Sequence, residues 1–309
     1  SIAEAYSSLG AIYRDKGNLK SALEEFNKAI SFGSDLGTAN IAIGKVYQDS
    51  GDHKEAFTSY YKEIIRTNGK EMKLLSIVGS LKELNLNGID RNNVKNLLEV
   101  LFKKNDLKHS DLFGIFNYLY KPIIFSQSVK DKTFRERESS QDIILNEQLI
   151  INALKKIIFT DIDWERLLQN IRRKYCNLIA NKSRELTVRE KELILALSEQ
   201  CFMNEYIYQK SEEENVLISK ILDRNREKII NSTDIIILTC YDPLYKLVEK
   251  NKYFENISSY DKSLFEIELL QLKEIKNERK LAKEIKKIGN IIDETSIKIR
   301  NQYENNPYP

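Results

Sequence analysis

The 309-residue chain has few of the residues that end helices and build tight turns, with 11 Gly and 4 Pro. Sandwiches, barrels and large α/β sheets need many turns, so this scarcity favours long helices joined by short polar loops. The chain has no apolar run of about 18 residues, and we therefore expect no membrane span. It has no dominant charge either, because Lys and Arg total 49 against 46 Asp and Glu. That near-balance argues against a dedicated nucleic-acid-binding protein.

Cysteine is also scarce, and Cys176, Cys201 and Cys240 lie far apart within apolar helical patterns. The chain contains no CxxC motif. Only His53 and His109 could join the thiols as ligands, so the ligand spacing of a zinc site is missing and we expect no bound metal. We expect buried, unreactive thiols in a reducing compartment, and hence a cytoplasmic protein.

Two segments near the N-terminus share residue types at a spacing of 34 positions. The matched positions are Gly10 and Gly44, Tyr13 and Tyr47, Ala22 and Ala56, and Phe26 and Tyr60. Each segment reads as two helices separated by a Gly-containing turn, at 16–18 and at 50–52. The small residues are expected where the helices of a hairpin cross closely, and the aromatic residues between successive hairpins. This pattern resembles the tetratricopeptide repeat, a helical hairpin with a period of 34 residues.

The resemblance implies an all-α protein in which tetratricopeptide-type hairpins form a short α-solenoid and a non-repeating helical domain follows. We expect hairpins at 3–36 and 37–70, a decayed third unit or capping helices at 71–90, a helical connector domain at 91–303, and an extended tail at 304–309. About three hairpins are usually needed for a stable array. Only two are clear here, so either earlier repeats have been removed or the helices after residue 70 cap the array. We expect the chain to be part of a longer protein.

Capping residues predict where several helices of the connector begin. The expected N-caps are Ser110, Asp161 or Asp163, Thr187 in a capping box with Glu190, and Ser211 in a capping box with Glu214. Pro122 is expected to end the helix that Ser110 begins.

Three further segments of the connector carry a prediction. Segment 125–141 has few apolar residues and reads as a flexible connection. Segment 235–240 is rich in β-branched residues but has no partner run with which to form a sheet, so we expect a buried helix. Segment 261–287 is expected to form one long helix with Lys and Glu on its outer face.

Tetratricopeptide hairpins usually bind peptides on the concave side of the array, which the first helix of each unit lines. By that resemblance the groove-facing positions are Glu4, Ser7, Ala11, Arg14, Thr38, Ile41, Lys45 and Gln48. Among them we expect Arg14, Ile41, Lys45 and Gln48 to form a partner groove. Ile41 would be the apolar anchor, and the two cations would attract an acidic or carboxylate-bearing peptide. The set lacks the converging Lys and Asn residues of a carboxylate clamp, so a plain solvated face is the alternative.

Three short strings resemble a narrower family. They are QCFMNEY at 200–206, CYDPL at 240–244 and QYENNPYP at 302–309. In this order they are similar to the region between repeats and catalytic domain in bacterial tetratricopeptide-containing methyltransferases that use S-adenosylmethionine. The resemblance covers roughly residues 140–309. It implies that a catalytic domain, which this chain lacks, belongs to the parent protein.

We predict no catalytic or cofactor-binding residue in this chain. It has no GxGxG turn between a strand and a helix, and no P-loop, so S-adenosylmethionine is expected to bind only in the parent's missing domain. Six residues are candidates for a junction with that domain: Asn204, Glu205, Tyr206, Tyr303, Pro307 and Tyr308. For 204–206 the alternative is a buried polar network. A stand-alone scaffold, or an activity that no motif reveals, is the alternative for the chain as a whole.

Overall fold

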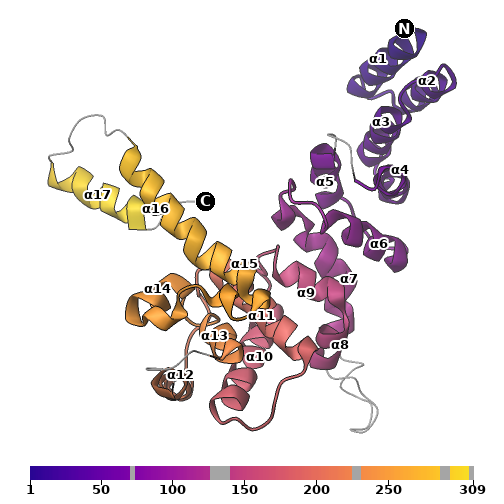
Figure 1. Cartoon of the computed structure of the whole chain (residues 1–309). Helices are drawn as coiled ribbons and strands as arrows, with labels where there is room; N and C mark the ends of the chain where they lie inside the picture. The colour runs from indigo at the N-terminus through magenta and orange to yellow at the C-terminus, as the bar shows by residue number, and fades with distance from the viewer. Residues whose placement is uncertain (70–73, 126–139, 225–230, 286–292, 306–309) are drawn as a thin grey trace, which may run out of the picture.

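The computed structural model describes residues 1–69, 74–125, 140–224, 231–285 and 293–305 (Figure 1). Within these ranges every regular element is helical and none is a strand. The prediction of an all-α fold, with tetratricopeptide-type hairpins followed by a non-repeating helical domain, is confirmed. The hairpins form an arm that leads away from the helical domain, with α1 at its tip (Figure 1).

The arm begins with two antiparallel helical hairpins. The first joins α1 (Ile2–Asp15) to α2 (Leu19–Ser31), and the second joins α3 (Leu36–Asp49) to α4 (His53–Thr67). Each helix has a polar N-cap whose side chain accepts a hydrogen bond from a backbone N–H of the first turn. The four caps are Ser1, Asn18, Asp35 and Asp52 in turn. Gly17 and Gly51 form the turns with φ of +76° and +77°. Glycine adopts this backbone conformation without steric cost, which explains why it stands in both turns.

The helices of each hairpin cross closely at a glycine, as predicted. A Cβ atom added at Gly10 would lie 2.9 Å from ring carbons of Phe26. One added at Gly44 would come closer still to the ring of Tyr60. The packing therefore leaves no room for a side chain at either crossing.

Two helices continue the arm, α5 (Leu74–Lys82) and α6 (Arg91–Leu101), and both contact α4. The large buried core includes residues from Ile41 in α3 to Leu272. The first hairpin lies outside it, and Ala22 and Phe26 of α2 form a separate small cluster with Val46 of α3. The domain boundary at residue 90 stays a prediction.

The helical domain is built around α11, whose residues 193–201 are all buried. Its elements up to α14 are η1 (His109–Leu112), α7 (Phe113–Phe125), α8 (Ser140–Asn146), α9 (Gln148–Leu154), α10 (Ile162–Ala180), α11 (Val188–Met203), α12 (Glu212–Arg224), α13 (Ser232–Leu238) and α14 (Leu244–Lys250). The later elements are η3 (Lys252–Phe254), η4 (Ile257–Ser259), η5 (Lys262–Leu264), α15 (Phe265–Glu268), the π-helical turn η6 (Leu269–Lys273), α16 (Glu274–Glu284) and α17 (Glu294–Asn305).

Most of the predicted helix starts are confirmed. Asp161 caps α10 by accepting a bond from the backbone N–H of Asp163, and Thr187 forms the capping box with Glu190. Ser211 and Glu214 make the two reciprocal bonds of a capping box. Segment 235–240 is helical through Leu238, as predicted. Most of the predicted flexible connection, residues 126–139, lies outside the described residues.

Three local predictions were wrong. Ser110 is not an N-cap but lies inside the 3₁₀ helix η1. Pro122 does not end its helix, because α7 continues to Phe125 and Ile124 in this last turn is buried in the core. A proline costs an interior helix its hydrogen bond to the carbonyl four residues earlier; here burial of the last turn offsets that loss. Segment 261–287 is no uniform α-helix, because 3₁₀ and π turns interrupt it.

Candidate functional site

The four predicted groove residues lie on α1 and α3 and differ in their contacts and exposure. Arg14 Nε on α1 donates to Asp49 Oδ2 on α3 at 2.6 Å. Gln48 Oε1 accepts a hydrogen bond from the Tyr60 hydroxyl at 3.1 Å, and Gln48 Nε2 lies 3.5 Å from the carbonyl oxygen of Ser80 on α5. These hydrogen bonds link α1 to α3 and α3 to α5.

Charge and exposure differ from those expected of a two-cation groove. The charge of Arg14 is balanced by Asp49. Ile41 is only 7% exposed and belongs to the large core, so it offers a partner little surface. Lys45 is half-buried, and no carboxylate of the described residues forms an ion pair with it. The groove stays a prediction, and Lys45 is the residue best placed to attract an anionic partner.

The candidate junction residues at 204–206 lie in a sharp turn after α11. Asn204 is the C-cap of that helix, and its side-chain amide is buried. Glu205 and Tyr206 follow with φ of 56° and 60°, and Glu205 is exposed. Tyr303 lies in α17, while Pro307 and Tyr308 lie outside the described residues. The junction role of all six residues stays a prediction.

Tyr206 connects the two internal strings through a buried polar network. Its hydroxyl donates to the carbonyl oxygen of Thr239 at 3.3 Å and lies 3.5 Å from Gln271 Oε1 in the π turn η6. The same Gln271 oxygen accepts the backbone N–H of Leu244, and its Nε2 donates to Ser198 Oγ at 3.2 Å. The network joins α11, α13, α14 and η6. Burial raises the pKa of Tyr206, which keeps its hydroxyl protonated and able to donate.

Gln200 has a separate structural role at the start of the first string. Its Nε2 donates to the carbonyl oxygen of Ile157 at 2.8 Å, and its Oε1 accepts the backbone N–H of Phe159 at 2.9 Å. Gln200 is fully buried. One amide side chain thus satisfies the backbone of the loop between α9 and α10, which would otherwise be buried without partners.

A buried arginine is the main polar feature that the sequence did not reveal. Arg172 is 1% exposed and donates to the carbonyl oxygen of Gln209 at 2.7 Å and to Glu214 Oε1 at 3.3 Å. Its guanidinium carbon lies 4.3 Å from the ring centre of Tyr241, whose hydroxyl also donates to Glu214. Burial alone would raise the pKa of Glu214, but bonds from Ser211 and Tyr241 and the charge of Arg172 lower it. The capping-box spacing identified Glu214 but gave no sign that its carboxylate is buried.

All three cysteines are fully buried, as predicted. Burial raises the pKa of the Cys176 thiol to about 11. Burial likewise raises the pKa of Cys240, whose Sγ lies 3.4 Å from the carbonyl oxygen of Ile236. Reactivity requires the thiolate, so both thiols are unreactive near neutral pH.

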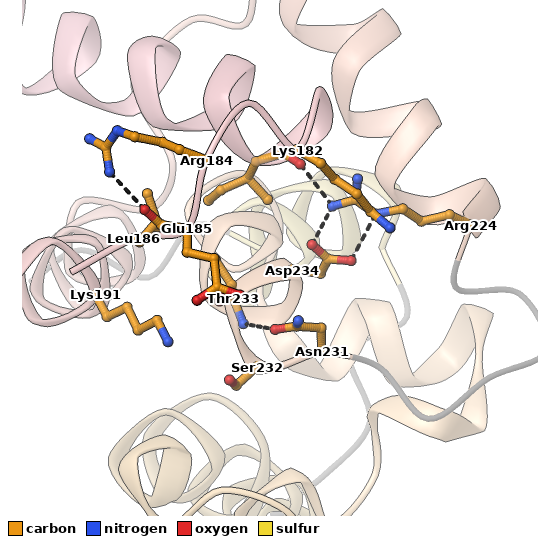
Figure 2. A pocket seen from close by; sticks show the side chains of 11 residues that line it. Lys182, Arg184, Glu185, Leu186, Lys191, Arg224, Asn231, Ser232, Thr233 and Asp234 are labelled. Atoms are coloured by element: carbon orange, nitrogen blue, oxygen red, sulfur yellow. Dashed lines mark hydrogen bonds and ion pairs between the residues drawn. The ribbon is translucent and has the colours of Figure 1, made fainter. Parts of the chain in front are cut away.

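A cavity of about 780 Å³ opens between the ends of α10 and α12 and the starts of α11 and α13 (Figure 2). The residues that line it are Ile179, Lys182, Arg184, Glu185, Leu186, Lys191, Arg224, Asn231, Ser232, Thr233 and Asp234. Arg224 forms an ion pair with Asp234 and donates to the carbonyl oxygens of Ile179 and Ala180. The charge of Arg224 is therefore balanced within the protein by Asp234.

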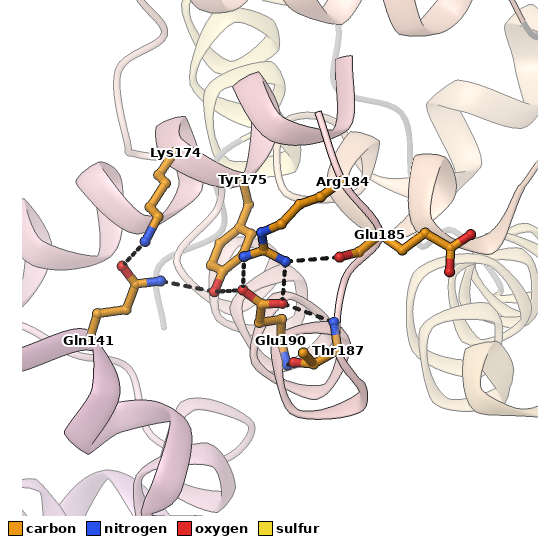
Figure 3. Close-up of polar contacts among 7 residues, drawn as sticks. All are labelled: Gln141, Lys174, Tyr175, Arg184, Glu185, Thr187 and Glu190. Atoms are coloured by element: carbon orange, nitrogen blue, oxygen red, sulfur yellow. Dashed lines mark hydrogen bonds and ion pairs between the residues drawn. The ribbon is translucent and has the colours of Figure 1, made fainter. Parts of the chain in front are cut away.

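Arg184, the second arginine of the cavity, is held by Glu190 in a network that reaches α8 (Figure 3). Glu190 also accepts from the Tyr175 hydroxyl at 3.2 Å, and Gln141 Nε2 donates to that hydroxyl at 2.9 Å. The hydrogen bond from Arg184 lowers the pKa of Glu190 to about 2. Both arginines of the cavity are paired with carboxylates, and its lining contains neither histidine nor cysteine.

Two general searches of the described residues gave negative results. No group of three His, Cys, Asp or Glu side chains there is arranged to hold a metal ion. No helix of the described ranges combines the length and apolar character needed to cross a membrane.

Comparison with protein-family models found one match, which covers the first hairpin. The family model of the tetratricopeptide repeat matches residues 3–32, which span nearly all of α1 and α2. A search of curated proteins found no match, and a search of solved structures found none either. The N-terminal part of the chain is thus a tetratricopeptide-type module, and repeats of this kind generally bind protein or peptide partners.

Proposed function

We propose that the chain is the partner-binding arm and helical connector of a larger S-adenosylmethionine-dependent methyltransferase. In this proposal the hairpins capture a protein or peptide, and the helical domain presents it to a catalytic domain outside this chain. The observation that carries the binding role is the tetratricopeptide hairpin at residues 3–32. A stand-alone scaffold with the same binding role is the alternative.

The connector role is supported by where two of the family-like strings lie. Strings 200–206 and 240–244 meet at Gln271, through the hydroxyl of Tyr206 and the backbone N–H of Leu244. Buried polar groups need their hydrogen-bond partners, and here the Tyr206 side chain and the Leu244 backbone share one acceptor, Gln271 Oε1. This gives both strings a joint structural role within one helical domain.

The binding role is tested by reversing one charge of the predicted groove. Lys45→Glu should weaken capture of an acidic partner, mainly through slower association at low salt, because exposed charges act on encounter. Lys54→Glu is the matched control, since Lys54 is exposed on α4. Arg14→Gln is preferable to Arg14→Glu, which would place a second carboxylate beside that of Asp49. The measurement is quantitative pull-down with each variant, after circular dichroism has shown an unchanged fold.

We expect the Lys45→Glu variant to recover smaller amounts of the partners that wild type and the Lys54→Glu variant recover. Equal recovery of the same partners by all variants would place recognition elsewhere on the chain.

The methyltransferase role is tested with the cofactor and with the parent gene. Calorimetric titration of this chain with S-adenosylmethionine should give no saturable heat, and a micromolar dissociation constant would contradict the assignment of the cofactor to another domain. The parent gene should continue after Pro309 with Arg-Trp and a GxGxG strand–turn–helix segment. A stop codon at that point would favour the scaffold.

A further inference from the structure

The π turn η6 separates a firmly held part of the C-terminal segment from an exposed part. Before the turn, Glu268 is buried and accepts the backbone N–H of Ser258 at 2.7 Å. Within the turn, the fully buried Gln271 joins α11 to α14 through its hydrogen bonds. After the turn, no residue of α16 is buried, and only Ile275 is half-buried. The helix thus leaves the body of the domain at η6 (Figure 1).

Exposed charges hold α16 against α14 and against the residue that follows η3. Lys276 Nζ lies 2.7 Å from Glu255 Oε1, and Arg279 Nη1 lies 3.4 Å from Glu249 Oε1. The guanidinium carbon of Arg279 also lies 4.6 Å from the ring centre of Tyr245. All four charged side chains are at least 42% exposed. Exposed ion pairs of this kind contribute little to stability, and salt weakens them further.

The two kinds of contact differ in their response to salt. The hydrogen bonds of Gln271 are buried, so dissolved ions do not screen them. The ion pairs of α16 lie in water, where added salt does screen them. Sharp bends in helices commonly occur at π turns, because the ladder of backbone hydrogen bonds is interrupted there. At η6, therefore, α16 can change direction without the loss of contacts in the core.

We propose that η6 is a hinge and that α16 is a lever arm, which the pairs Lys276–Glu255 and Arg279–Glu249 hold in one direction. When these pairs are released by salt or by mutation, α16 swings about η6 while the rest of the helical domain keeps its fold. The device changes the direction in which α16 leaves the domain. Its test involves neither Lys45 nor a cofactor, so its failure is distinguishable from failure of the function proposed above.

The first test measures distances between two spin labels on the whole chain by pulsed electron paramagnetic resonance. One label is attached to Leu281→Cys near the end of α16, and the other to Val216→Cys on α12; both positions are exposed. A second reference label at the exposed Val188→Cys on α11 detects movement in another direction. The three native cysteines are buried and should stay unlabelled. Leu281 lies about 12 Å along the helix from η6, so a swing of about 30° would move its label by about 6 Å.

Lys276→Gln/Arg279→Gln should shift or broaden the Leu281 distance distributions by about this amount at low salt. Sodium chloride at about 1 M should do the same to the chain with its natural charges. The matched control is Lys280→Gln/Lys283→Gln, which removes two cations of α16 that form no ion pair within the described part of the chain. Its distributions should match those of the unchanged helix. Unaltered distances in Lys276→Gln/Arg279→Gln would overturn the proposal, as would an equal change in the control.

The second test locates the hinge with a label at Glu274→Cys, directly after η6. In Lys276→Gln/Arg279→Gln this label should keep its distance to Val216→Cys, because a lever moves least beside its hinge. Equal displacement of the labels at 274 and 281 would overturn the hinge, since α16 would then have detached together with η6. Circular dichroism should be the same in all variants. A loss of helical signal in Lys276→Gln/Arg279→Gln would also overturn the proposal, because α16 would then unfold rather than swing.

Discussion

The two hairpins share a residue pattern but differ in what covers them. In the first, Phe26 packs in a small cluster and Leu9 and Ile12 remain exposed. In the second, Phe57 and Tyr60 belong to the core that continues through the helical domain. Repeats of this kind are stabilised by their neighbours as much as by their own contacts. We therefore expect place in the array, more than the repeat pattern, to decide how firmly each hairpin is held.

The largest effect is expected in the shared core rather than in the first hairpin. Glu214→Ala leaves Arg172, which is 1% exposed, without its carboxylate. Removing one partner of a buried ion pair costs about 3–5 kcal/mol. Urea denaturation should show this loss in the free energy of unfolding. The double change Arg172→Met/Glu214→Leu should lose less, because no buried charge is left alone; a larger loss in the double variant would contradict the assigned pair.

The next largest loss of stability is expected when leucine replaces the glycine at a helix crossing, and it should differ between the two hairpins. Gly44→Leu should destabilise by about 1–3 kcal/mol or more, as overpacking of a core does. The Tyr60 ring that it meets is fully buried and is fixed by a bond to Gln48. Gly10→Leu should cost less, because Phe26 lies in a small cluster at the end of the arm. Thermal melts measure both, and a melt unaltered by Gly44→Leu would show that the repeat register is wrong.

Acid should weaken the helical domain through Glu190. Its folded pKa of about 2 lies below its ordinary value of 4.5, so its stabilising effect is complete above pH 4.5 and is lost as the pH falls toward 2. Because Arg184 is 47% exposed, screening reduces the effect to about 1–2 kcal/mol. Unfolding free energies of wild type and Glu190→Gln at pH 6 and pH 3 test this. Between pH 6 and pH 3 the Glu190→Gln variant should lose less unfolding free energy than wild type. Equal losses would show that Glu190 does not cause the acid sensitivity.

The smallest effect should be the same in both hairpins. Gly17→Ala and Gly51→Ala place a side chain at φ of +76° and +77°, with no atom within 4 Å of the new Cβ. The cost is therefore backbone strain alone, about 1 kcal/mol each. Chemical denaturation should show equal losses, and a clear difference would mean that the two turns are not equivalent.

The sequence predicted the features that depend on local pattern. The 34-residue spacing located both hairpins. Capping chemistry placed the starts of α10, α11 and α12, because an N-cap contact joins residues only two or three positions apart. The burial of the three cysteines followed from their apolar surroundings. Pro122 shows the limit of such reasoning, since its effect on α7 depended on tertiary burial of the residues after it.

The polar interior could not be predicted, because its partners are distant in the sequence. Gln271 bonds residues of α11 and α14, and nothing near it in the chain marks it as buried. The exposure of the predicted groove residues could not be predicted for a similar reason: the ion pair of Arg14 with Asp49 and the burial of Ile41 depend on how the helices pack. The groove itself stays a prediction.

Native-state hydrogen exchange tests the difference between the two hairpins most directly. Backbone amides of α2 should exchange through a local opening of low free energy, while those of α4 should exchange only with the helical domain, whose core they share. The fraction of deuterium in peptides covering residues 19–31 and 53–67 measures this. Faster exchange in the first peptide across the whole time course agrees with the account, and equal protection of the two would contradict it.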